Sequence, residues 1–187
     1  MACRKDQSLE LAVKSTKLVR SLTKDNPGAQ DTEWAYEFSP KTFSGSDPVF
    51  VVRLCEAGKA AWEPNVENPI TFNLPATFEM STPNVYADKI EYFAHNFPKE
   101  RRFVSLYTPH NDRGYAVAAA ELAQMAGADR VEGRLFGNVE LFTLALNLYI
   151  QGISPNIDLV EVSTKIPVNL RASYGGQLVV CAFSGTH

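Results

Sequence analysis

Hydrophobic and polar residues follow two spacings along the chain, one typical of helices and one typical of short strands. Leu11, Leu18 and Leu22 recur at helical spacing, whereas the run 69–75 is typical of a strand between two prolines. Asp47 followed by Pro48 is typical of a helix cap and first turn. The pattern predicts helices over about residues 8–24, 47–62, 81–96, 114–125 and 139–150, and strands over 33–38, 69–75, 102–107 and 130–136.

After the first helix, each predicted strand is followed by a helix. This repetition predicts a parallel α/β sheet or a piece of a (β/α)8 barrel. Polar residues fall just past the predicted strand ends, namely Ser39, Thr77, His110 and Asn138. Because both kinds of fold place their sites at the carboxyl ends of the strands, we expect a functional site there.

The composition and charge of the chain exclude some classes of binding partner. The chain has 187 residues, 45% of them hydrophobic and 21% charged, which is typical of one globular domain. Eighteen basic against 21 acidic residues give a net charge of −3, so we expect no nucleic-acid partner. The longest apolar run, residues 178–183, is far too short to cross a bilayer, so we expect no membrane partner.

The cysteines and the N-terminal residues indicate in which cellular compartment the protein is expected. Cys3, Cys55 and Cys181 are an odd number without metal-type spacing, so we expect reduced thiols in a cytosol-like compartment. The first residues show neither a signal peptide nor a clear transit peptide. The prediction is a cytoplasmic protein, with a mitochondrial location as the alternative.

The densest polar cluster is His110-Asn111-Asp112-Arg113-Gly114, between a predicted strand and a predicted helix. A divalent metal or an oxyanion could bind there, since imidazole and amide groups coordinate metals and a helix N-terminus favours negative charge. The alternative is structural, because Asn and Asp commonly cap helices. The chain contains no glycine-rich dinucleotide or phosphate-loop motif.

Several long motifs stand out along the chain. They are Asn-Leu-Pro-Ala-Thr at 73–77, Glu-Met-Ser-Thr-Pro-Asn-Val-Tyr-Ala-Asp at 79–88, His-Asn-Asp-Arg-Gly at 110–114, Gly-Ala-Asp-Arg-Val-Glu-Gly at 127–133 and Phe-Ser-Gly-Thr-His at 183–187. Together these motifs resemble the 2-isopropylmalate synthase family, which also includes homocitrate synthases, and in particular its fungal sequences. The resemblance implies a (β/α)8 catalytic barrel. It also implies an acyltransferase that condenses acetyl-CoA with 2-oxoisovalerate to give 2-isopropylmalate, an intermediate of leucine biosynthesis.

The resemblance also implies roles for particular residues. His110 and Asn138 would be ligands of a divalent cation (Mg, Mn or Zn). The 2-oxoisovalerate pocket would be lined by Ser39, Pro75 and Thr77. His187, which alone would look like part of a tail, would take part in acid–base chemistry.

The chain departs from the family pattern at positions that matter for the cation. Thr108 stands where the family motif has its first metal-binding histidine, and Lys41 stands where a catalytic glutamate is expected. The loop after Asn138 is several residues short, so Asn138 could align with either of two family asparagines. Two neutral donors bind divalent ions poorly, so we expect the cation to be weakly bound, if at all.

The family strand that carries an Arg-Asp-Gly motif would precede Met1. A barrel of this class needs about 250 residues. We therefore expect the C-terminal half of the barrel, about four βα units, in residues 1–152, and a post-barrel segment in 153–187. Free sheet edges and an apolar inner face predict self-association or association with a full-length homologue.

Three interpretations remain open. The chain could be an acyltransferase for leucine-type precursors or for a specialised metabolite or toxin. It could be an impaired remnant or binding module that associates with a full-length homologue. A mis-spliced gene model would also produce such short deletions.

Overall fold

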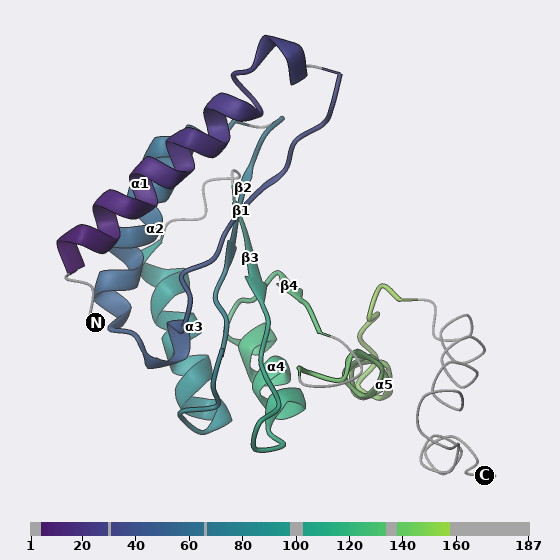
Figure 1. The fold of residues 1–187 in the computed structure, drawn as a ribbon. Coiled ribbons are helices and arrows are strands. Elements are labelled where there is room, and N and C mark those ends of the chain that lie inside the picture. Colours follow the sequence, from purple (N-terminus) through teal and green to yellow (C-terminus); the bar gives the residue numbers. More distant parts are fainter. Residues whose placement is uncertain (1–4, 30, 66, 98–102, 134–137, 158–187) are drawn as a thin grey trace, which may run out of the picture. The chain divides into compact units, whose positions relative to one another are not determined.

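In the computed structural model, the described residues form a sheet of four short parallel strands (Figure 1). They are β1 (Tyr36–Phe38), β2 (Ile70–Asn73), β3 (Phe103–Tyr107) and β4 (Arg130–Val131). Phe38 pairs with Phe72, Asn73 with Leu106, and Tyr107 with Val131. The structure describes residues 5–29, 31–65, 67–97, 103–133 and 138–157.

The helices follow the strands in the expected order. They are α1 (Lys5–Leu22), α2 (Pro48–Trp62), α3 (Pro83–Asn96), α4 (Ala116–Met125) and α5 (Leu141–Ile150), with 3-10 turns at Pro27–Ala29 and Phe43–Gly45. Each crossover from β1 to β4 moves one strand in the same direction. Right-handed crossovers of this kind place their helices on the same face of a sheet. The strand order therefore confirms a singly wound α/β fold of barrel type.

The core lies between the sheet and its helices. Ile70 and Phe72 of β2 are fully buried, and Phe72 meets Phe97 edge-on with ring centroids 4.9 Å apart. On the neighbouring strand, Tyr36 stacks on Trp62 of α2 at 4.4 Å. Because side chains alternate along a strand, these contacts place the residues between them on the opposite face of the sheet.

Helix α2 confirms the capping motif seen in the sequence. The Asp47 carboxylate accepts a hydrogen bond from the Val49 backbone N–H at 3.2 Å, and Pro48 occupies the first turn. Lys5 also pairs with Asp47 at 2.6 Å, which brings the start of α1 to the start of α2.

Several predicted boundaries are wrong. Helix α1 begins at Lys5 and ends at Leu22, and β1 holds only the last three of the six predicted residues. Helix α4 starts two residues late because Gly114 takes a positive φ of 83°. Val139, predicted to be helical, instead donates its backbone N–H to Pro109 O at 2.8 Å.

The chain divides into two compact units, Met1–Leu141 and Phe142–His187. The first holds the sheet and α1 to α4, and the second holds nearly all of α5. The predicted domain boundary at residue 152 stays a prediction. Within the described ranges, no helix is both long and apolar enough to cross a membrane.

Candidate functional site at the strand ends

The carboxyl ends of β2 and β3 continue beyond the strands as a narrow backbone ladder. His110 N–H donates to Ala76 O at 3.2 Å, and Ala76 and Pro109 form a parallel bridge. His110 and Asn138 form an antiparallel bridge. The two residues predicted as metal ligands are therefore direct neighbours on paired backbone, although they lie far apart in the sequence.

The residues predicted to line the oxoacid pocket lie on two strand ends. Pro75 is buried and its carbonyl accepts the Ser44 N–H at 3.4 Å, while Thr77 Oγ1 accepts the Thr42 N–H at 3.1 Å. These bonds fix the end of β2 to the loop after β1. Ser39 is exposed just after β1, and the described residues show no hydrogen bond between it and the other predicted site residues. His187, predicted to act as acid or base, lies outside the described residues.

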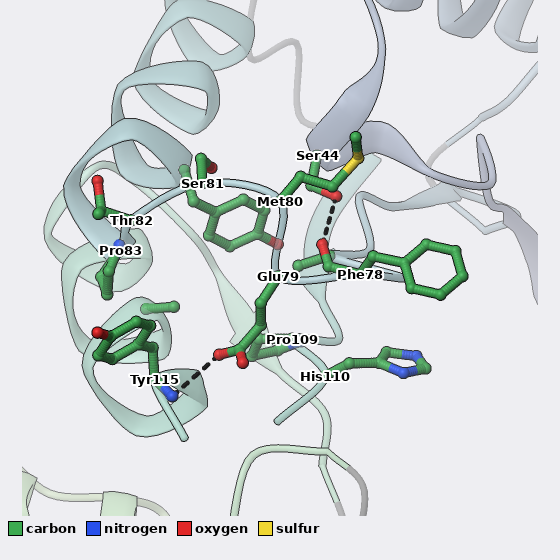
Figure 2. A pocket seen from close by; sticks show the side chains of 13 residues that line it. Ser44, Phe78, Glu79, Met80, Ser81, Thr82, Pro83, Pro109, His110 and Tyr115 are labelled. Carbon is green, nitrogen blue, oxygen red and sulfur yellow. Dashed lines mark hydrogen bonds between the residues drawn. The ribbon is translucent and has the colours of Figure 1, made fainter. Parts of the chain in front are cut away.

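The N-terminus of α4 is already occupied by a carboxylate of the same chain. Glu79, in the loop after β2, accepts the Arg113 N–H with one oxygen and the Tyr115 N–H with the other, the latter at 2.9 Å (Figure 2). In return the Arg113 guanidinium donates to Glu79 O at 3.1 Å. A carboxylate at this place stabilises the positive end of the helix dipole.

The polar cluster after β3 thus has a structural use. Asn111 Oδ1 accepts the Ala116 N–H at 3.2 Å, which is the capping role left open by the sequence. Asn111 satisfies the first N–H group of α4, and Glu79 satisfies two N–H groups of the turn just before the helix. An external oxyanion would therefore have to displace Glu79. Sequence reasoning missed Glu79 because nothing local distinguishes it from an exposed acidic residue.

A small hollow lies beside Glu79 and Tyr115 (Figure 2). It is lined by Ser44, Phe78, Glu79, Tyr86 and His110, among others, and its volume is about 10 Å³. Such a volume holds about one water molecule. The hollow is therefore too small for a 2-oxoacid as it stands.

A second polar feature lies on the face of the sheet opposite the helices. Asn73 Nδ2 donates to Glu37 Oε1 at 2.9 Å, and Thr108 Oγ1 donates to Asn73 Oδ1 at 3.2 Å. Sequence reasoning noted Thr108 only as a departure from a motif and did not select Glu37 or Asn73. Glu37 alternates with the partly buried Tyr36 and Phe38, and Asn73 follows the buried Phe72. This alternation is the signal that could have placed Glu37 and Asn73 on one face.

The donors in the described ranges do not form a complete site for a divalent cation. His110 and Asn138 adjoin, but the Thr108 hydroxyl donates to Asn73. Among the described residues, no three His, Cys, Asp or Glu side chains gather where they could hold a metal ion. Divalent ions with oxygen-rich shells take about six donors, so the pair alone does not fit one.

Comparison with known proteins gives a consistent set of relatives. The model of the HMGL-like family matches residues 1–165. A 2-isopropylmalate synthase of Saccharomyces cerevisiae is 56% identical over 98% of this chain and 32% of its own length. A second from that yeast, named 2-isopropylmalate synthase 2, mitochondrial, is 53% identical over 98% of this chain and 33% of its own length. The chain thus spans about a third of the length of these curated relatives.

A solved structure supports the fold. An HMG-CoA lyase from Acinetobacter baumannii, in complex with coenzyme A and 3-methylmalate, superposes with a TM-score of 0.65 at 18% sequence identity. The superposition covers 92% of this chain and 58% of the lyase chain. At this identity the likeness shows the fold alone.

Proposed function

The chain belongs to the HMGL-like family. From that premise we propose that it acts as a 2-isopropylmalate synthase-type acyltransferase. The substrates would be acetyl-CoA and 2-oxoisovalerate, and the product, 2-isopropylmalate, would supply leucine-type precursors. A use of that product in a specialised metabolite or toxin is part of the same proposal. The relative at 56% identity supports this assignment.

One structural observation supports the proposal most strongly. The backbone bridge between His110 and Asn138 lies at the carboxyl ends of parallel strands, beside the strand end that carries Pro75 and Thr77. Four of the six predicted site residues thus share one edge of the sheet, where α/β folds bind their ligands.

The proposed reaction forms one carbon–carbon bond and breaks one thioester. A base takes a proton from the acetyl methyl group of acetyl-CoA, and the resulting carbanion adds to C2 of the oxoacid. The keto oxygen takes up a proton and becomes a hydroxyl. Water then hydrolyses the thioester and releases coenzyme A as a free thiol. At this edge, Thr77 would contact the oxoacid. His187, which lies outside the described residues, would serve in proton transfer.

The incomplete set of metal-binding side chains favours an alternative, non-catalytic role for the chain. The described ranges hold no three-residue metal group, and Lys41 is exposed near the end of β1. A cation placed there would weaken the binding of a second positive charge. On this reading the chain would be an impaired module that acts only together with a full-length homologue.

Release of free thiol from acetyl-CoA tests both roles. The chain is incubated with acetyl-CoA, 2-oxoisovalerate and Mg²⁺ or Mn²⁺, alone and mixed with a complete homologue, with His110→Ala as the matched control. We expect oxoacid-dependent release that His110→Ala abolishes. Activity that exceeds the homologue's own only in the mixture would support the module instead, and oxoacid-independent release would contradict both.

A further inference from the structure

The face of the sheet opposite the helices carries a line of polar side chains. Ile70 and Phe72 of β2 point into the helix-covered core, so Thr71 and Asn73 lie on the other face. On β1, Tyr36 and Phe38 pack toward the helices, which places Glu37 on the same face as Asn73. Thr108, just after β3, reaches Asn73 from the other side.

The hydrogen bonds in this line have only one possible direction. An ionised carboxylate accepts hydrogen bonds and cannot donate one, so Glu37 requires the amide nitrogen of Asn73 to face it. The amide oxygen of Asn73 must then face Thr108. Because that oxygen only accepts, the Thr108 hydroxyl has to donate its proton to it. Through these two hydrogen bonds, Glu37 fixes the orientation of a hydroxyl two strands away.

We propose that Glu37 is a positioning residue that acts through Asn73 to orient the Thr108 hydroxyl, so that the strand end leading to His110 presents a hydrogen-bond acceptor rather than a donor. The proposal rests on the proposed function, because it assigns these residues to the same strand-end site. A group that bonds directly to the Thr108 oxygen would have to be a donor, such as a hydroxyl, an ammonium or a water. Because 2-oxoisovalerate has no donor of its own, its binding would depend on Thr108 through a bridging water or through the position of the strand end that leads to His110.

The line also holds the strand end in place. Thr108 is followed by Pro109 and His110, whose backbone groups join the neighbouring strand ends through Ala76 and Val139. A side-chain bond at Thr108 therefore ties this ladder to β1 and β2 from the open face. Hydrogen bonds to a carboxylate are among the stronger ones in proteins, so the bond between Asn73 and Glu37 can help to hold this strand end in place.

Four substitutions and one matched control separate positioning from general stability. Thr108→Val and Asn73→Leu break the line with little change in volume. Glu37→Gln keeps an oxygen that can accept from Asn73, whereas Glu37→Leu removes it. Thr71→Val is the control, because Thr71 lies on the same face of β2 but, among the described residues, makes no side-chain hydrogen bond to Glu37, Asn73 or Thr108. The readouts are the His110 imidazole signals in ¹H–¹⁵N spectra, assigned with His110→Gln, and the affinity for 2-oxoisovalerate by titration calorimetry.

We expect Thr108→Val, Asn73→Leu and Glu37→Leu to move the His110 signals and to weaken 2-oxoisovalerate binding about fivefold, the factor for one lost hydrogen bond. Thr71→Val should stay near the native values. Glu37→Gln should give smaller changes than Glu37→Leu, because the Gln amide keeps an acceptor oxygen but can also turn its NH2 group toward Asn73. His110 signals that respond equally in Thr71→Val, or in none of the variants, would overturn the inference. If the signals respond as expected while the native chain binds no 2-oxoisovalerate, the proposed function fails and the positioning role of Glu37 stands.

Discussion

Single side chains decide what the strand-end loops can bind. Glu79 sits at the N-terminus of α4, where the sequence alone suggested a metal or an oxyanion, and Glu37 sets the direction of a hydrogen-bonded line through Asn73. Each joins residues that are 36 positions apart. The same dependence on surroundings governs Cys55, which is completely buried in α2.

The buried thiol of Cys55 makes stability depend on alkaline pH. Burial, with a smaller contribution from the Glu56 carboxylate, raises the pKa of Cys55 far above its usual range. Above about pH 8.5 the thiol therefore ionises only in the unfolded chain, which then binds fewer protons than the native chain. This part of the stability is fully present below that pH and declines above it, with a slope of at most about 1.4 kcal/mol per pH unit.

Urea unfolding at a series of pH values measures this effect. Cys55→Ala should show a flatter decline in the free energy of unfolding between about pH 8.5 and 10 than the native chain does. Parallel profiles for the two proteins would show that Cys55 ionises equally in both states.

At the scale of elements, two glycines show how closely neighbouring segments of the backbone and side chains approach. A Cβ atom on Gly133 would overlap the carbonyl oxygen of Val139, which belongs to the backbone next to Asn138. A Cβ on Gly58, in the middle of α2, would lie 3.5 Å from the ring of Phe38, an ordinary contact distance. The first position has no room for a side chain, whereas the second does.

Alanine at these two glycines should have opposite effects. Gly133→Ala should lower the free energy of unfolding by about 1–3 kcal/mol, because backbone rather than a flexible side chain has to move. Gly58→Ala should raise it by up to about 1 kcal/mol, the difference in helix propensity. Chemical denaturation compares them, and equal effects of the two substitutions would contradict the close approach at Gly133.

On the scale of the whole molecule, the first unit has an apolar stripe on α1. Leu11, Leu18 and Leu22 recur along one side of this helix and are 62%, 59% and 60% exposed. Helix α1 packs against α2, and its Thr16 hydroxyl is hydrogen-bonded to the Tyr36 hydroxyl of β1. Exposed apolar side chains grouped on one side of a helix are typical of a surface that another protein segment covers.

We therefore expect the stripe to mediate association. Leu18→Glu should shift the chain toward the monomer in sedimentation velocity, alone or mixed with a complete homologue, because it places a charge in the apolar contact. Met125→Glu is the matched control, since Met125 is 83% exposed at the end of α4 and away from the stripe in sequence. The expected association would be refuted if the native chain sediments as a monomer both alone and in the mixture with the homologue.

The sequence by itself determined the order of the elements, the parallel α/β class and the cap of α2. These features depend on residues a few positions apart, such as Asp47 and Val49, whose interactions follow from local geometry. Only the tertiary structure decided that His110 adjoins Asn138, that Glu79 fills the N-terminus of α4 and that Thr108 donates to Asn73. Their partners lie 28 to 36 positions away, and strand register selects them, so no local pattern contains them.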